Sequence, residues 1–150
     1  MANWLVKTEP DAYSLADLKR EGTTRWDGIR NYQARNFMRD DMQVGDRVFI
    51  YHSSCKVPAV VGIAEVVKAA YPDPAQFDVS SKYFDEKATE DKPRWVCVDI
   101  AYRSTLTKPV TLKQIKADEA ITELALKKSG RLSVMPVTDA DWQQIISLAQ

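Results

Sequence analysis

The sequence predicts an α+β fold in which helices flank one small, twisted, barrel-like and mostly antiparallel sheet. Three observations support this prediction. The chain has 150 residues, close to the commonest size of one domain, and its composition of 45% hydrophobic and 28% charged residues suffices for a core. Strand-like and helix-like segments follow each other without the regular alternation of a parallel β-α-β sheet. No repeat, linker or low-complexity tract divides residues 1–150 into separate domains.

The first third of the chain is expected to form two strands and two helices. Residues 4–6 are apolar and open the first strand. Ser14 has an acid three residues later, the pattern of a capping box, which predicts a short helix that ends at about Gly22. Apolar side chains at helical spacing predict a second helix over residues 31–40, and the β-branched and aromatic residues 47–52 predict a strand.

The middle third is expected to form two strands joined by a long excursion. Residues 59–70 are apolar on both faces, as in a strand that is covered on both sides. A Pro-Asp-Pro sequence at 72–74 breaks the chain. The stretch 76–92 is polar with isolated aromatic residues, which makes it a candidate functional loop. Residues 95–102 alternate and predict the next strand.

The last third is expected to be mostly helical. Residues 111–116 and 119–128 have helical patterns, and 132–134 predict a last short strand. Thr138 is followed three residues later by Asp141, which predicts a capping box that opens a final helix.

Charge and cysteine content limit the function. Lys and Arg total 21, Asp and Glu total 21, and the formal net charge is zero. A basic field over the whole protein is therefore excluded, and any binding of nucleic acid must rest on a local basic patch and a specific pocket. Cys55 and Cys97 lack the spacing of a zinc site or a disulfide framework, so neither a metal nor another cofactor is expected.

The sequence also bears on location. It begins Met-Ala-Asn-Trp, without a basic segment followed by an apolar one, which predicts no signal peptide. The longest apolar stretch, 57–64, is too short to span a bilayer and contains Pro58 and Gly62. No membrane partner is expected, and a cytoplasmic location is predicted.

Several motifs distributed over nearly the whole chain resemble those of one family. The longest is WDGIRNYQARN at 26–36, preceded by WLVKTEP at 4–10. The others are GD at 45–46 with YHS at 51–53, VGIAEV at 61–66, AYPDP at 70–74, PRW at 93–95, PVTL at 109–112 and GRLSV at 130–134. Together they are similar to the EVE domain family of the PUA-like superfamily.

The resemblance implies a PUA-like fold, similar in architecture to the YTH domain that recognises a methylated adenine in RNA. It implies a non-catalytic module that holds a modified nucleobase, such as a modified cytosine or adenine, in an aromatic-walled pocket. The partner is then DNA or RNA that carries this base. The lack of a basic N-terminal extension favours a bacterial form.

A base pocket needs flat walls that replace stacking. Trp26 lies in a polar stretch and is the best wall candidate, although a core tryptophan is the alternative. Tyr32 is a second candidate wall. Tyr83, in the polar excursion, either folds over the pocket as a lid or anchors the loop to the core. The Asn31 amide either faces the pocket or simply caps the second helix.

A base pocket also needs polar groups for the edge of the base. His52 and Ser53 end a strand and open a loop, and neutral imidazole can donate or accept a hydrogen bond. Ser133 is a further candidate. By the resemblance to the YTH architecture, Lys7 and Thr8 line the pocket at the end of the first strand. The alternatives are a structural role for His52 and a surface ion pair for Lys7.

Four arginines lie within fifteen residues and are candidates for contacts with phosphates, namely Arg25, Arg30, Arg35 and Arg39. The planar guanidinium group suits phosphate oxygens, whereas a solvated helix face is the alternative.

A different class of function is a small amidohydrolase of the related ASCH type that acts on a modified nucleoside. Lys7, Thr8 and Glu65 are the candidates for its chemistry. Neighbouring side chains on a strand diverge, which disfavours joint action of Lys7 and Thr8. A protein-interaction module is a third possibility.

Overall fold

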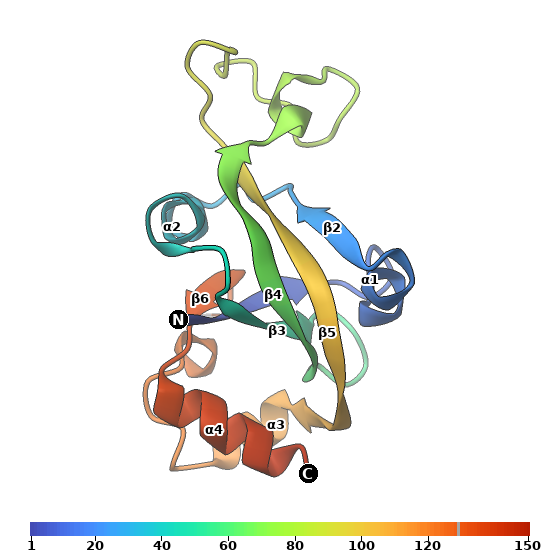
Figure 1. The fold of residues 1–150 in the computed structure, drawn as a ribbon, viewed down its shortest axis with the longest axis vertical. Helices are drawn as coiled ribbons and strands as arrows, with labels where there is room; N and C mark the ends of the chain where they lie inside the picture. Colours follow the sequence, from blue (N-terminus) through green and yellow to red (C-terminus); the bar gives the residue numbers. More distant parts are fainter. Residues whose placement is uncertain (129) are drawn as a thin grey trace.

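The computed structural model describes residues 1–128 and 130–150. Its centre is a mixed sheet with the strand order β2-β5-β4-β3-β1-β6 (Figure 1). The strands are β1 (Asn3–Thr8), β2 (Thr23–Trp26), β3 (Arg47–His52), β4 (Ala59–Pro72), β5 (Val96–Thr111) and β6 (Val134–Pro136). Strands β1 and β3 are parallel and every other neighbouring pair is antiparallel. The sheet is twisted but is not closed, because β2 and β6 form its two edges.

Four α-helices lie around this sheet (Figure 1). They are α1 (Leu15–Glu21), α2 (Tyr32–Asn36), α3 (Leu112–Ala117) and α4 (Asp139–Leu148). Helix α2 continues directly into a π-helical turn, η1 (Phe37–Asp41), so the helix predicted over 31–40 is a composite. Two 3-10 turns, η2 (Pro74–Phe77) and η3 (Ala125–Lys127), complete the elements. Within the described residues, no helix is both long enough and apolar enough to cross a membrane.

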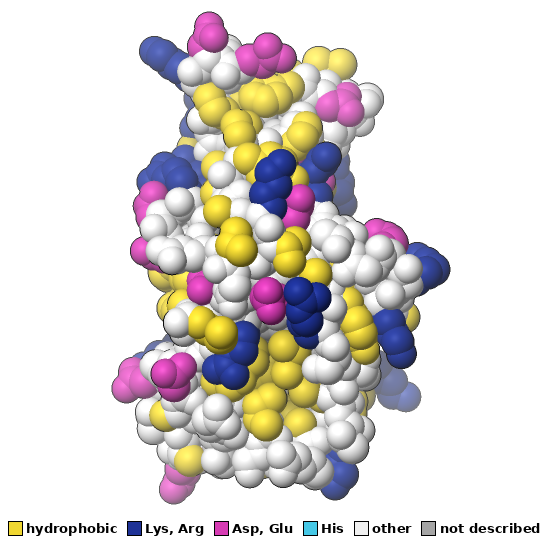
Figure 2. All heavy atoms as spheres, viewed as in Figure 1, with side chains coloured by type: hydrophobic (Ala, Val, Ile, Leu, Met, Phe, Trp, Pro, Cys, Tyr) yellow, Lys and Arg dark blue, Asp and Glu magenta, His cyan; other side chains and the backbone are white. Residues whose placement is uncertain are grey.

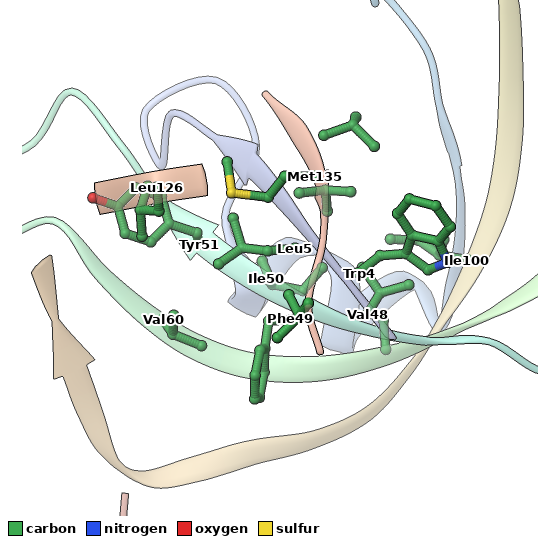
Figure 3. Packing of buried hydrophobic residues seen from close by; sticks show 14 of the residues in the cluster. Trp4, Leu5, Val48, Phe49, Ile50, Tyr51, Val60, Ile100, Leu126 and Met135 are labelled. Atoms are coloured by element: carbon green, nitrogen blue, oxygen red, sulfur yellow. The ribbon is translucent and has the colours of Figure 1, made fainter. Parts of the chain in front are cut away.

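The core lies between the central strands and the C-terminal part of the chain (Figure 3). Leu5, Phe49 and Met135 have no exposed surface, which shows that β1, β3 and β6 contribute their apolar faces to one interior. The rings of Phe49 and Trp142 stack with centroids 3.6 Å apart, and this contact joins α4 to the sheet. Trp4 and Trp142 are both buried in this core.

Strands β4 and β5 form a long hairpin whose far end carries residues 73–95 beyond the sheet (Figure 1). The sequence predicted that β5 would end near residue 102. The strand instead continues to Thr111, because its polar second half still pairs with the start of β4, from Ala59 to Gly62. Strand β2 was not predicted, since its four residues are mostly exposed and polar and take their strand form from pairing with β5.

The helix predicted over 119–128 is wrong, because only the short turn η3 forms there. The amide groups of Thr122 and Glu123 donate to the Asp141 carboxylate at 3.2 and 3.0 Å. They therefore do not form the backbone hydrogen bonds of an α-helix. Thr138 does cap α4, as its side chain accepts from the Asp141 amide. The Asp141 carboxylate, however, accepts from the segment before η3 and not from the Thr138 amide, so it links this segment to α4 and does not complete a capping box.

Candidate functional site

A cavity of about 840 Å³, here called the main cavity, opens beside the end of β1 and the edge strand β2. Its lining comes from residues 7–9, 12–13, 24–29, 53–54, 82–83, 130–131 and 133. Two strands and five connecting segments thus meet at one place. A volume of this size lies within the range of about 300–1,000 Å³ that is usual for sites that bind small molecules.

Trp26 forms one aromatic wall of the main cavity. It is the last residue of β2, and its backbone pairs with Val98 of the neighbouring strand. The side chain is only 7% exposed, and the Tyr13 ring packs edge-on against it with the centroids 6.1 Å apart. Trp26 is therefore both a core residue and a wall of the cavity.

Tyr83 forms a second aromatic wall and is held there by its backbone and by a glycine. The Arg30 guanidinium donates from Nε and Nη2 to the Tyr83 carbonyl oxygen, at 3.0 and 2.8 Å. Gly28 has a φ of 77°, and a Cβ atom at this position would lie 2.8 Å from the Tyr83 ring. The ring thus packs directly on the Gly28 backbone. Tyr83 is therefore anchored by these contacts, and its ring also lines the main cavity.

The loop that carries Gly28, Ile29 and Arg30 depends on the buried carboxylate of Asp73. This carboxylate accepts from the Gly28 amide at 2.9 Å and from Arg30 Nη1 at 3.0 Å. It also accepts from the Ala75 amide at 2.9 Å, so it joins the cavity wall to the excursion 73–95. A buried carboxylate with three donors is well compensated, which makes this corner of the cavity preorganised.

Polar groups lie at the floor and rim of the main cavity. The Ser53 amide donates to the Thr8 carbonyl oxygen, and the Lys7 amide donates to the Ser133 carbonyl oxygen, both at 2.9 Å. Ser54 has a φ of 53°, a left-handed conformation that non-glycine residues adopt rarely and often at functional sites. These contacts hold Ser53 and Ser133 on the two sides of the end of β1, and both line the main cavity together with Ser54.

Charged side chains of both signs surround the main cavity. The cations are Lys7, Arg25, Lys82 and Arg131, and the carboxylates are Glu9 and Asp27. Partial burial, and then the charge of Asp73, raises the pKa of Asp27. Burial lowers the pKa of Lys7, whose ammonium group donates to the Gly130 carbonyl oxygen at 2.9 Å. The face of the molecule drawn in Figure 2 carries charges of both signs as well, in keeping with the zero net charge.

The main cavity brings together seven of the residues selected from the sequence. They are Lys7, Thr8, Arg25, Trp26, Ser53, Tyr83 and Ser133. The sequence analysis missed Asp27, Ser54, Lys82 and Arg131. Asp27 directly follows Trp26 in the longest motif, and Lys82 precedes Tyr83, so adjacency was the available signal. Nothing in the sequence pointed to the backbone conformation of Ser54.

Asn31 and Tyr32 do not line the main cavity, which corrects their prediction as pocket residues. The Asn31 side-chain oxygen accepts from the Ala34 amide at 2.9 Å, so this residue caps α2. The Tyr32 ring stacks on Trp95 with centroids 4.9 Å apart and keeps 48% of its surface exposed. Because α2 starts here, both side chains are directed by the helix and away from the cavity.

His52 is also outside the main cavity, because its imidazole faces α1. His52 Nε2 accepts from the Leu15 amide at 3.1 Å, a bond that requires the neutral ring. Burial lowers the pKa of His52, in agreement with this role. The structural alternative, which the sequence left open, describes this residue.

Three of the four arginines selected for phosphate contacts have partners inside the protein. Arg30 pairs with Asp73, Arg35 Nη1 donates to the Arg94 carbonyl oxygen at 3.0 Å, and Arg39 pairs with its neighbour Asp40 at 2.8 Å. None of these three lines the main cavity, whereas Arg25 does.

The geometry does not gather the residues of the hydrolase alternative. Thr8 Oγ1 donates to the Tyr13 carbonyl oxygen at 2.7 Å, so its proton points away from Lys7. In the sheet register Glu65 pairs with Arg47, four residues along β3 from the partner of Lys7, or about 13 Å at strand spacing. Among the described residues, no group of three His, Cys, Asp or Glu side chains could hold a metal ion.

Comparisons with known proteins identify the family. The model of the EVE domain matches residues 2–148. This chain belongs to the EVE domain family. It is 36% identical to human thymocyte nuclear protein 1 over 168 residues, which cover 99% of this chain and 74% of the human protein.

Solved structures agree with this assignment. A crystal structure from Pseudomonas putida is 50% identical, has a TM-score of 0.95 and covers 99% of this EVE domain and 100% of that chain. Human THYN1 in complex with DNA containing 5-methylcytosine is 34% identical with a TM-score of 0.96, over 100% and 98% of the two chains. An ASCH protein from Zymomonas mobilis, 13% identical with a TM-score of 0.55, shares the fold alone. The fold is the expected PUA-like one.

Proposed function

We propose that this EVE domain binds DNA that carries a modified cytosine and holds that base, turned out of the double helix, in the main cavity. One observation carries the proposal: two aromatic walls, Trp26 and Tyr83, face a cavity that also presents a carboxylate and several cations. The human relative that was crystallised with DNA containing 5-methylcytosine supports the choice of partner. A base leaves its stack at a cost of a few kcal/mol, and the walls must compensate that cost.

The aromatic walls supply the affinity for the base. Stacking of a base on an aromatic side chain contributes about 1–3 kcal/mol per base. Tyr83 is held by Arg30 and by its contact with Gly28, so little conformational entropy is lost when the base enters.

Asp27 supplies the discrimination between bases. Cytosine presents an amino group at position 4, which a carboxylate accepts, whereas thymine presents a carbonyl oxygen there. A carboxylate at the end of the cavity therefore favours 5-methylcytosine over thymine, although both carry a 5-methyl group. This contact needs the ionised form, so the preference should decrease as the pH falls through the raised pKa of Asp27.

Binding of duplexes with one 5-methylcytosine, one cytosine or one thymine at the same position, at fixed salt, tests the proposal. We expect the wild type to prefer 5-methylcytosine. Tyr83→Ala should weaken this binding about 5- to 100-fold through the lost stacking. Tyr32→Ala removes an exposed aromatic ring outside the cavity and should have no effect. Equal binding of all three duplexes by the wild type would contradict the proposal.

The same titration tests Asp27. In Asp27→Asn the carboxamide can also donate to the thymine oxygen, so the preference for 5-methylcytosine over thymine should fall about tenfold. Glu9→Gln removes the other carboxylate of the main cavity and is the matched control. An unchanged preference in Asp27→Asn would assign the discrimination to another group.

A further inference from the structure

A second, smaller hollow of about 320 Å³ adjoins the main cavity. Both are lined by Lys7, Ser53, Ser54 and Gly130, so the two spaces lie side by side at the end of β1. We call the second space the lysine groove. Beyond the shared residues, its lining is Tyr51, Pro58, Leu112, Lys116, Leu126, Lys127 and Lys128.

The charge of the lysine groove differs from that of the main cavity. Four lysines line it, and no carboxylate does among the described residues. Two of the four are fixed within the fold, since Lys7 Nζ donates to the Gly130 carbonyl oxygen and Lys127 Nζ donates to the Asp118 and Ile121 carbonyl oxygens. Lys116 and Lys128 are exposed at the rim. The groove therefore offers two mobile ammonium groups beside two anchored ones.

The floor of the lysine groove is apolar. Leu126 and the ring of Tyr51 are buried, and Leu112 and Pro58 complete the surface. The Lys7 ammonium lies 5.9 Å from the Tyr51 ring centroid, which places a cation over the aromatic face where the two spaces meet. An apolar floor below cations suits a ligand that has both a flat or carbon-rich part and an anionic part, such as a nucleotide.

We propose that the lysine groove holds the nucleotide next to the base in the main cavity, with its phosphodiester against Lys116 and Lys128. This assignment rests on the proposed function, because a chain whose base occupies the main cavity must continue past Lys7 and Ser54. Ammonium groups bind phosphate oxygens as point charges, and the absence of a lining carboxylate removes the opposing repulsion. The position of the groove directly beside the main cavity favours a nucleic-acid strand over an acidic peptide.

The test uses 5-methyldeoxycytidine alone and the same nucleoside extended by one nucleotide on its 5′ side or on its 3′ side. Binding is followed by amide shifts in NMR spectra, which detect weak affinities. One of the two extensions should strengthen binding about tenfold in the wild type. In the double variant Lys116→Gln/Lys128→Gln this gain should fall below threefold, while the nucleoside alone binds as before.

Longer single strands provide a second readout. The slope of log affinity against log salt concentration should become shallower by about 1.4 in the double variant, as expected for two lost phosphate contacts on a single strand. Lys113→Gln/Lys87→Gln removes two lysines outside both spaces and is the matched control, which should change neither the slope nor the gain.

The outcomes separate the two proposals. If the wild type prefers the modified base but the double variant keeps the full gain and slope, the groove assignment is wrong and the proposed function stands. If the wild type shows no preference for the modified base, the proposed function is wrong. If a glutamate-rich peptide shifts the groove resonances and the extended nucleotides do not, the groove binds acidic peptides and the assignment is overturned.

Discussion

Gly28 is the residue at which backbone conformation and cavity shape depend on each other. Its φ of 77° lies in the left-handed region, and the Tyr83 ring occupies the space that a Cβ atom would need. Gly45 has a similar φ of 95°, but nothing lies within 4 Å of the corresponding position. A substitution at Gly45 therefore introduces backbone strain alone, whereas one at Gly28 introduces backbone strain and a clash with the cavity wall.

Gly28→Ala and Gly45→Ala form a matched pair of variants. Both should lose about 1–2 kcal/mol of unfolding free energy, because alanine is strained in the left-handed conformation. Only Gly28→Ala should also displace Tyr83 and weaken the binding of DNA with 5-methylcytosine. Urea unfolding and the duplex titration measure the two effects, and equal binding by both variants would refute the role of the Gly28–Tyr83 contact.

His52 predicts a dependence of stability on pH. Burial lowers its pKa in the folded state below the ordinary value of 6.5. The unfolded chain therefore takes up a proton first as the pH falls, so the stabilising contribution of neutral His52 is present above pH 6.5 and is lost as the pH falls from there through the folded pKa. The free energy of unfolding should decrease as the pH is lowered from 7.5 to 5.5, and this decrease should be smaller in His52→Gln.

Since His52 is the only histidine of the chain, its imidazole protons give one resolved NMR titration. A titration midpoint at or above pH 6.5 in the folded protein would contradict this explanation.

Some of the sequence-selected residues that line the cavity lie at the ends of strands that were also predicted, whereas Arg25 and Trp26 lie on the unpredicted strand β2. Lys7 and Thr8 end a strand that was predicted, and Ser53 follows another. Asp27 was missed although it directly follows Trp26 in the longest motif. Strand β2 ends at Trp26, so Asp27 already belongs to the loop and lines the same space.

At the level of elements, α4 is joined to the rest of the fold by a buried carboxylate as well as by apolar packing. Asp141 is 1% exposed and accepts from two backbone amides of the segment before η3. This segment precedes Lys127 and Lys128, so its position also determines one side of the lysine groove.

Asp141→Ala should lower the unfolding free energy by about 2–3 kcal/mol, because it leaves two partly buried amide groups without an acceptor. Asp141→Asn keeps one acceptor oxygen and should lose less. Gln143→Ala, at an exposed position of the same helix, should change little. Denaturant unfolding measures all three, and a loss in Gln143→Ala as large as that in Asp141→Ala would show that the two amide contacts of Asp141 are not the cause, since alanine itself favours the helix.

Elements with a strong local signal could be predicted, and elements that depend on a distant partner could not. The capping pattern at Ser14 gives the start of α1, and the β-branched and aromatic residues 47–52 give β3 with its observed bounds. The segment 119–128 has a helical pattern, but two of its amide groups donate to Asp141, which lies about twenty residues later in the chain. No local pattern contains that information.

For the molecule as a whole, the irregular order of strand-like and helix-like segments correctly indicated an α+β fold, whereas the strand order could not be derived from it. Strand β1 lies between β3 and β6, parallel to the first and antiparallel to the second. That arrangement follows from which apolar faces complete the core, and many orders satisfy the same local patterns. Because the net charge is zero, the protein has no basic field as a whole, and cationic groups can attract a nucleic acid only where they gather, as in the lysine groove.

The pairing of β1 also has a consequence for how the chain folds. Val6 pairs with Ile50 on one side and with Val134 on the other, so during synthesis β1 waits for a partner that lies 128 residues later in the chain. Contacts of such long sequence separation slow folding, because the closing of the loop costs entropy before any contact compensates it. We therefore expect folding to be completed only after β6 has left the ribosome, and the lining of the main cavity, which combines Lys7 with Ser133, to form at that last step.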